Sequence, residues 1–322
     1  MHKEVNSMKE YILAIETGGT KIQMVIGTIA GDILYNYRFE VRKEFGSKGI
    51  LKDILSALPL LENKARELNG KIIKIGIGFG GPVNSKEGIV IGSAQISGWK
   101  EFPIANFFEK KTGYPTYVFN DSNAAAWGEY IKGSGNGSNI FFYTNMGSGV
   151  GGGFVINGEL YDGQGFGASE MGQTYIGNPL TYQNVQVEKL CSGWGIENRL
   201  RNSNVQSDSF LWELCNGKKN KLNCIMLGIA IEQKDEFALK FLDATAELFA
   251  IALCNVIHLL SPECIAIGGG VSLLGPFLIK RINYYVSKYV YVNNVGKYKI
   301  VKCVLDEDVV LVGTLLLTAK EK

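Results

Sequence analysis

The stretch YILAIETGGTKIQMVIGTIAGDILYNYRFEV, residues 11–41, decides the fold. It predicts three strands, because β-rich runs are separated by the turn segments GGT and AGD. A second stretch, NIFFYTNMGSGVGGGFVING at residues 139–158, repeats the order of strand, glycine loop and strand. Helical patterns follow both stretches. This repetition predicts two α/β lobes with a cleft between them.

The rest of the chain supplies further predicted elements around these strands. Strands are expected in KIIKIGIGF, IVIGS, TYVFN, CIAIGGG and KIVKCVL. Helices are expected over residues 50–68, 103–113 (with Gly113 as the C-cap), 187–201, 209–216, 222–230 and 236–260, with others in SNAAAWGEYIKG directly after Asp121, from Pro276 and after Asp308. The predicted division is a smaller lobe of residues 9–120, completed by the helix at 308–322, and a larger lobe of residues 121–307.

Composition narrows the class of protein. The chain has 322 residues and a formal net charge of +2, with no basic block, so nucleic acid is not an expected partner. Its six cysteines form no CxxC pair and no signal peptide is visible, which predicts reduced thiols and a cytoplasmic location. The longest apolar run, FAIALCNVIHLL at 249–260, is too short to span a bilayer and predicts a buried helix.

Histidine is scarce, with only two in the chain. His2 lies near the N-terminus, and His258 lies within the apolar run, where we expect a core histidine with satisfied hydrogen bonds. Without histidine clusters or paired cysteines, a zinc site has few residues from which it could be built.

Three glycine-rich loops each follow a predicted strand. Such loops let backbone N–H groups converge on phosphate oxygens, although glycine also serves tight hairpins. None has the spacing of a Walker A motif. Three such glycine-rich loops, distributed over two lobes, favour a nucleotide ligand. The residues concerned are Gly18, Gly19, Thr20 and Lys21; Gly147, Ser148, Gly149, Val150 and Gly151; and Gly268, Gly269 and Gly270.

Asp121 is the leading candidate for chemistry, because it follows a strand and begins a helix, where α/β proteins place ligands. A helix cap is the competing interpretation, but Ser122 or Asn123 could cap equally well. A carboxylate near phosphate loops suits a general base that accepts a hydroxyl proton during phosphoryl transfer.

The segment FGASEMGQTYIGN, residues 166–178, places Glu170 and Gln173 among small and apolar residues. Such a segment could line a site for a metal, a phosphate or a sugar, or have no ligand. Phosphate is disfavoured, because Glu170 would repel it.

Together the motifs IETGGTK, NDSNAAAWGE, MGSGVGGGFVINGELYDG, SEMGQ, VEKLCSG and PECIAIGGGVS resemble the ROK family of sugar kinases and repressors. The resemblance extends from about Tyr11 to the terminal VLVGTLLLTA. It implies the actin/hexokinase-like (ribonuclease H-like) α/β fold, with two lobes and a central cleft. It also implies ATP and Mg²⁺ as cofactors, phosphorylation of a hexose, usually at O6, and a homodimer.

Residue by residue, the resemblance implies that Asp121 is the catalytic base. Five residues would contact the sugar besides Asp121: Gly81, Asn120, Glu170, Gln173 and Glu188. The first two glycine loops would bind phosphates, and Gly268–Gly270 would bind adenosine.

Two positions depart from the family pattern. Glu16 stands where an aspartate is usual; its carboxylate could still hold a Mg²⁺-bound water, and a fructokinase-like branch also has Glu there. Gln173 replaces the zinc-binding histidine, and YIGNPLTYQNVQ replaces the cysteine-rich loop, so zinc is predicted to be absent. Gln173 can still donate to and accept from a sugar hydroxyl.

The expected function is therefore an ATP-dependent hexose kinase with glucose as the first-ranked substrate. Fructose, mannose and an N-acetylated amino sugar are the alternatives; Glu16 and GFGGPV favour the fructokinase-like branch, whereas the rest of the chain is closer to glucose-type members. A non-enzymatic sugar sensor is the other alternative. A repressor is disfavoured, because about twenty residues before the first glycine loop leave no room for a helix-turn-helix segment.

Overall fold

The computed structural model describes residues 8–93, 95–164, 169–177 and 183–322. Chain contacts divide it into two units, one of residues 1–131, 160–168 and 307–322, the other of 132–159 and 169–306. The predicted boundary placed residues 121–131 with the second lobe, whereas their contacts place them in the first unit. His2 and residues 165–168 and 178–182 of the sequence motifs lie outside the described residues. Each unit is described by itself.

The first unit is built on a five-stranded sheet in the order β3-β2-β1-β4-β7. The first three strands form antiparallel pairs, and β4 and β7 continue the sheet in parallel with β1. Their bounds are β1 Lys9–Thr17, β2 Lys21–Gly27, β3 Ile33–Glu40, β4 Gly70–Phe79 and β7 Thr116–Asn120. The short pair β5 (Val83–Asn84) and β6 (Ile89–Val90) lies after β4.

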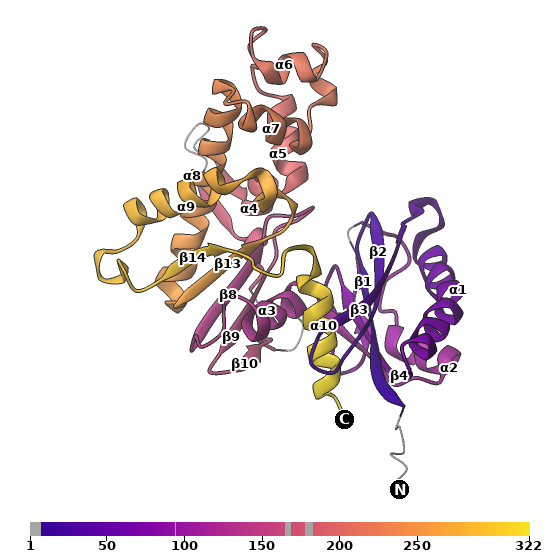
Figure 1. Cartoon of the computed structure of the whole chain (residues 1–322). Coiled ribbons are helices and arrows are strands. Elements are labelled where there is room, and N and C mark those ends of the chain that lie inside the picture. The colour runs from indigo at the N-terminus through magenta and orange to yellow at the C-terminus, as the bar shows by residue number, and fades with distance from the viewer. Residues whose placement is uncertain (1–7, 94, 165–168, 178–182) are drawn as a thin grey trace, which may run out of the picture. The chain divides into compact units, whose positions relative to one another are not determined.

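Both faces of this sheet are buried, and the period of two along β1 decides which residues face which layer. Leu13 and Ile15 belong to the cluster that includes α1 (Gly46–Glu67) and α2 (Ile104–Thr112). Ile12 and Ala14 instead pack with α10 (Val309–Lys320). Figure 1 shows α1 and α2 on one side of the sheet and α10 on the other. The helix α3 (Asp121–Lys132) is packed tightly on α10, since a Cβ on Gly313 would lie 1.7 Å from the Ala124 oxygen.

The second sheet repeats the arrangement of the first, in the order β10-β9-β8-β13-β14. The hairpin strand β9 is antiparallel to β8, and β13 and β14 follow in parallel. The bounds are β8 Ile140–Asn145, β9 Gly152–Ile156, β10 Glu159–Tyr161, β13 Cys264–Gly268 and β14 Lys299–Lys302. In each sheet a central first strand has its hairpin on one side and parallel crossovers on the other, as the repeated sequence pattern predicts.

Helices supply most of the second unit and its core. The largest, α8, is an amphipathic helix that packs beside α9. The bounds are α4 Val187–Cys191, α5 Gly193–Arg201, α6 Phe210–Leu214, α7 Cys224–Glu232, α8 Glu236–Leu260 and α9 Pro276–Tyr289. The remaining strands, β11 (Tyr175–Gly177) and β12 (Asn184–Gln186), form a small antiparallel pair.

Two local predictions were wrong, and a third was confirmed only in part. The helix expected over 187–201 is broken at Ser192, whose backbone is extended and whose Oγ accepts from the Gly195 N–H to cap α5. His258 is exposed, because the last turn of α8 leaves the core; its Nε2 accepts from the Tyr291 N–H at 2.9 Å. The strand expected in IVIGS extends only over Ile89–Val90.

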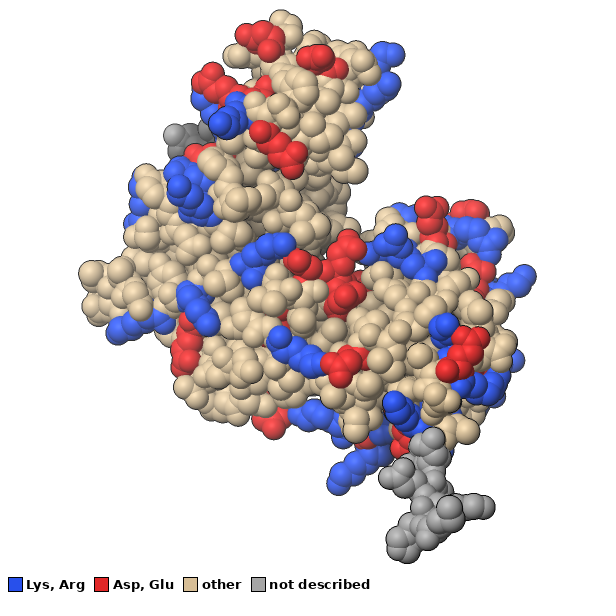
Figure 2. Space-filling view, viewed as in Figure 1, with Lys and Arg blue, Asp and Glu red and all other residues tan. Residues whose placement is uncertain are grey.

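Within the described residues, no helix is long and apolar enough to cross a bilayer. The six cysteines are free thiols, and five of them are buried. On the face drawn in Figure 2, basic and acidic side chains are interspersed, which agrees with the absence of a basic block in the sequence.

Candidate active site

Asn120 and Asp121 lie where β7 ends and α3 begins, and the two side chains have different partners. The Asn120 Oδ1 accepts from the Asn123 N–H at 3.0 Å, so Asn120 caps the helix. Its Nδ2 donates to the Gly81 carbonyl at 3.1 Å. Asp121 Oδ1 accepts from the Ser122 N–H at 2.7 Å. Asn120 caps α3 and Asp121 Oδ1 satisfies a further N–H of its first turn, while Asp121 Oδ2 lies beside Gly80.

The Asp121 carboxylate lies beside the glycine pair that ends β4. A Cβ placed on Gly80 would be 3.4 Å from Asp121 Oδ2 and 3.2 Å from the Thr17 carbonyl. The Gly80 N–H also donates to the Thr17 carbonyl at 3.1 Å. The end of β1, the Gly80–Gly81 turn and Asp121 therefore form one edge of the first sheet, and the first glycine loop begins directly after Thr17.

Glu16 lies near that loop in a partly buried and mostly acidic environment. Its Oε2 accepts from the Gln23 Nε2 at 3.0 Å. Burial raises the pKa of Glu16, the hydrogen bond and the charge of Lys21 oppose this rise, and Glu307 and Asp308 add to it. Lys21 lies 3.9 Å from Glu307. A carboxylate beside a phosphate loop could hold a water of a bound Mg²⁺ ion.

In the second unit, the other two glycine loops are joined through the backbone. The Met146 N–H donates to the Gly268 carbonyl at 2.9 Å, and the Val271 N–H donates to the Met146 carbonyl at 2.8 Å. Gly269 has φ +81°, and a Cβ there would lie 2.6 Å from the Met146 carbonyl oxygen. Only glycine fits this junction without strain. The loops that sequence reasoning assigned to phosphate and adenosine are thus neighbours.

Glu188, in the first turn of α4, also belongs to this junction. Its Oε2 accepts from the Val150 N–H at 3.0 Å, and a Cβ on Gly149 would lie 2.6 Å from the same oxygen. Glu170 interacts electrostatically with Glu188. Burial raises the pKa of Glu170, and the negative charge of Glu188 raises it further. The structure therefore brings Glu170, Glu188 and the second glycine loop together.

Gln173 ends the short 3-10 turn Met171–Gln173 that follows Glu170. Its side chain is exposed, and its Oε1 accepts from the Gln186 Nε2 at 3.1 Å, so β12 helps to hold it. Ser169, just before Glu170, has φ +71°, and its buried Oγ has no hydrogen-bond partner within the described residues. No motif or periodicity indicated this strained position.

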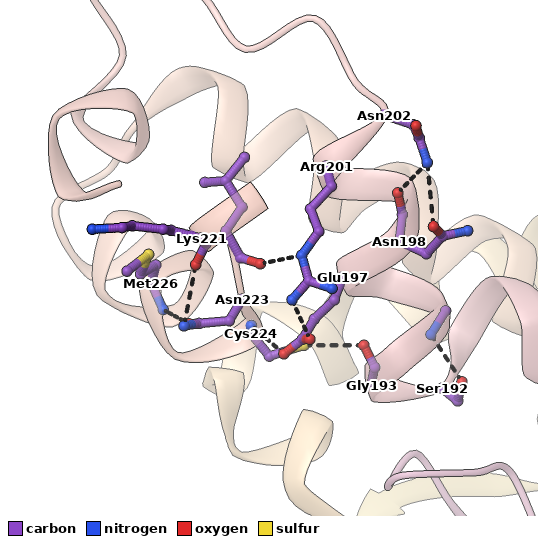
Figure 3. A network of polar contacts seen from close by, with 12 residues as sticks. Ser192, Gly193, Glu197, Asn198, Arg201, Asn202, Lys221, Asn223, Cys224 and Met226 are labelled. Carbon is purple, nitrogen blue, oxygen red and sulfur yellow. Dashed lines mark hydrogen bonds and ion pairs between the residues drawn. The ribbon is translucent and has the colours of Figure 1, made fainter. Parts of the chain in front are cut away.

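A polar network behind the second glycine loop was also missed by sequence reasoning (Figure 3). Glu197 accepts from the Arg201 guanidinium at 2.8 Å and from the Cys224 N–H at 3.2 Å, which joins α5 to α7. The Cys224 thiol contacts the Gly193 carbonyl at 3.5 Å. The Gly193 N–H in turn donates to the Gly147 carbonyl at 2.7 Å. The glycine loop is thus supported from behind by the start of α5.

Trp99 and Trp194, which lie near the site motifs in the sequence, differ in burial. Trp99 is buried between Phe79 and Phe102, with ring centroids 5.2 and 5.4 Å away, and serves packing. Trp194 has 47% of its surface exposed. In the described part of the chain, no group of three or more His, Cys, Asp or Glu residues is arranged to hold a metal ion.

Comparison with known proteins identifies the family. A sequence model of the ROK family matches residues 12–321. The chain belongs to the ROK family. It is 31% identical to a glucokinase of Halalkalibacterium halodurans over 284 residues, which cover 87% of this chain and 86% of that protein. A glucokinase of Thermotoga maritima is 28% identical over 306 residues, covering 94% and 95%.

A solved ROK structure gives the same fold. The ROK family glucokinase of Streptomyces griseus, in complex with glucose and AMPPNP, superimposes with a TM-score of 0.83 and 25% identity. The match covers 97% of this chain and 100% of that one. The actin/hexokinase-like fold implied by the sequence is therefore confirmed, as is membership of the family.

Proposed function

We propose that this ROK-family chain is an ATP-dependent hexose kinase that phosphorylates a sugar hydroxyl, with glucose at O6 as the first candidate. One observation carries the assignment of the base: Asp121 Oδ2 lies beside the Gly80–Gly81 turn, whose Gly80 N–H donates to Thr17 at the start of the first glycine loop. Similarity to glucokinases over most of the chain supports the reaction class.

Asp121 accepts the proton of the sugar hydroxyl as that oxygen attacks the γ-phosphate. Asn120 keeps the start of α3 in place and fixes the Gly81 carbonyl. Residue 81 requires glycine, since at φ +153° a Cβ would lie 2.9 Å from the Gly92 carbonyl oxygen, and its backbone is proposed to lie against the sugar. The hydroxyl is thereby held for attack in one orientation, which is the main contribution an enzyme makes to phosphoryl transfer.

Glu170, Glu188 and Gln173 bind the hydroxyls of the same hexose. Carboxylates accept strong hydrogen bonds from hydroxyl groups, and buried polar partners reject analogues that lack a hydroxyl. The raised pKa of Glu170 reflects the cost of burying its carboxylate, to which the charge of Glu188 adds. A sugar whose hydroxyl groups donate hydrogen bonds to the Glu170 and Glu188 carboxylates would offset part of that cost.

Backbone N–H groups of the loops at Gly18–Lys21 and Gly147–Gly149 bind phosphates, and Gly268–Gly270 lies against adenosine. Mg²⁺, when bound with ATP, supplies neutralisation of the charge that develops on the phosphates. Glu16 fits a water-mediated role toward that ion, because its carboxylate lies close to the loop and to Lys21. Zinc is proposed to be absent, because Gln173 replaces a histidine ligand; residues 178–182 of the replaced loop lie outside the described part.

Fructose, mannose and N-acetylated amino sugars are the alternative substrates. They are retained because Gln173 stands where the family has a histidine in the proposed sugar site. Gln173 offers a neutral donor and acceptor and lies on the same short turn as Glu170. A non-enzymatic sugar sensor is the alternative outside enzymes. We further propose a cytoplasmic homodimer that binds no nucleic acid; the free cysteines support a reducing compartment.

A coupled assay of ADP release over a panel of hexoses tests the function. We expect Mg²⁺-dependent turnover with at least one hexose, and unchanged turnover after zinc chelation. Absence of turnover with every sugar, combined with tight binding of one, would instead identify a sensor. Loss of activity on zinc chelation that Mg²⁺ does not restore would contradict the proposed absence of zinc.

A further inference from the structure

Gln95, which neither the motifs nor the proposed mechanism uses, lies directly over the first glycine loop. A Cβ placed on Gly19 would be 1.6 Å from the Gln95 Oε1 and 2.7 Å from its Cδ. The side-chain amide therefore occupies the space that any side chain at residue 19 would fill. Glycine at this position permits the contact.

The segment that carries Gln95 is anchored on both sides within the first unit. The Ser93 Oγ accepts from the backbone N–H groups of Gln95 and Ile96, each at 3.2 Å. Further along, the Ser47 N–H donates to the Ser97 carbonyl at 2.9 Å, and the Ser47 Oγ donates to the Gly98 carbonyl at 3.0 Å. These contacts hold the segment to the start of α1, so the backbone brings the Gln95 amide to Gly19.

The first loop lies next to the proposed base, which indicates the phosphate it would meet. The loop begins after Thr17, whose carbonyl accepts from the Gly80 N–H, and Gly80 lies beside Asp121. The phosphoryl group that a hydroxyl near Asp121 attacks is the terminal one. The Gly18 N–H donates to the Lys21 carbonyl at 3.2 Å, so this one N–H of the loop is not available to that group.

We propose that Gln95 contacts the transferred phosphoryl group, with its Nε2 donating a hydrogen bond to a γ-phosphate oxygen held at the first glycine loop. This inference rests on the proposed kinase function. The Gln95 side chain is exposed, and an amide can donate to phosphate without adding charge. Gln95 would add a side-chain donor to the backbone donors of the loop.

The test measures the affinities for ATP and ADP, each with Mg²⁺, by calorimetry on the whole chain. Gln95→Met removes the donor at similar length, and Gln95→Glu replaces the amide with a carboxylate. We expect Gln95→Met to weaken ATP binding about tenfold while ADP binding stays within about twofold, as for one hydrogen bond to a charged group. Gln95→Glu should weaken ATP binding further, because its charge repels the γ-phosphate. Lys100→Ala, an exposed change on the same segment, is the control and should match the wild type.

Kinetics on the same variants separate this inference from the proposed function. If the wild type phosphorylates a hexose, Gln95→Met should lower kcat about tenfold with little change in the KM for the sugar. Equal affinities of wild type and Gln95→Met for ATP would overturn the inference. Equal weakening of ATP and ADP would also overturn it, since that indicates a structural role for the segment. A wild type without any turnover would refute the kinase function, while the ratio of the two affinities still decides the role of Gln95.

Discussion

A carboxylate oxygen of Glu188 accepts the backbone N–H of Val150 at 3.0 Å, so one side chain of α4 holds the second glycine loop. The same carboxylate is proposed to bind the sugar. In the proposed kinase, Glu188 would couple the sugar site to the second glycine loop through this one carboxylate. Sequence motifs could assign Glu188 only one of these two roles.

Separating the two roles gives the first prediction. Glu188→Gln keeps an oxygen acceptor for the Val150 N–H but loses the charge, whereas Glu188→Ala loses both. We expect Glu188→Ala to lower the free energy of unfolding by about 1–3 kcal/mol, the cost of leaving a donor unpaired. Glu188→Gln should stay closer to wild type in stability while raising the KM for the sugar. Urea unfolding and kinetics measure these effects, and equal stability of the two variants would argue against the loop contact.

The raised pKa of Glu170 predicts a dependence of stability on pH. Burial and the charge of Glu188 raise the pKa in the folded chain, so the folded state binds more protons than the unfolded state. The unfavourable contribution of Glu170 is thus absent below the unfolded pKa of about 4.5 and appears as pH rises through the folded pKa. Glu170→Gln should be more stable than wild type at pH 7, and the difference should shrink toward pH 4.

Thermal unfolding of both proteins across this pH range measures the effect. Kinetics on Glu170→Gln should show weaker sugar binding, because the substitution that raises the stability also removes a carboxylate from the proposed sugar site. A wild type that is more stable than Glu170→Gln at pH 7 would contradict the direction of the pKa shift.

Alanine substitutions at Gly269 and at the neighbouring Gly270 form a matched test of the loop junction. At Gly269, alanine would adopt φ +81° and place its Cβ 2.6 Å from the Met146 carbonyl oxygen. We expect Gly269→Ala to lose about 1–3 kcal/mol from backbone strain alone, and to bind ATP less tightly because the two loops separate. Gly270→Ala meets no atom within 4 Å of its Cβ and should keep wild-type stability. Similar unfolding free energies for both variants would exclude a constraint at the loop junction.

The capping role of Asn120 is tested by two substitutions. Asn120→Ala removes the acceptor for the Asn123 N–H and should cost about 1 kcal/mol, a typical value for the loss of a helix cap. Asn120→Asp keeps the acceptor but cannot donate to the Gly81 carbonyl. We expect it to fold well but to bind the sugar weakly. Wild-type stability of Asn120→Ala would show that another residue caps α3.

Much of the fold could be predicted from the sequence, because its signals are local. The strands flanking the glycine turns and the 25 residues of α8 (Glu236–Leu260) follow directly from periodicity and turn residues. The break at Ser192 was missed, because a serine inside a helical pattern caps a new helix only where the chain turns. His258 was placed in the core because its neighbours are apolar, although the end of α8 projects from the core.

The site was predictable only where one motif contains all partners. Asn120 and Asp121 are adjacent in sequence, and both were identified from the strand-to-helix junction. Gln95 and Gly193 could not be found in this way, because their partners Gly19 and Gly147 lie far away in the sequence. Contacts of this kind arise from tertiary packing and leave no periodic pattern in a single sequence.

The central claim is that Asp121 is the base of a sugar kinase, and turnover of Asp121→Asn tests it most directly. Asparagine has the same shape and can still accept from the Ser122 N–H, so folding should be retained. It cannot accept the hydroxyl proton, and we expect kcat to fall by about 10²–10⁴-fold at an unchanged unfolding midpoint. Near-normal turnover of a well-folded Asp121→Asn protein would contradict the account.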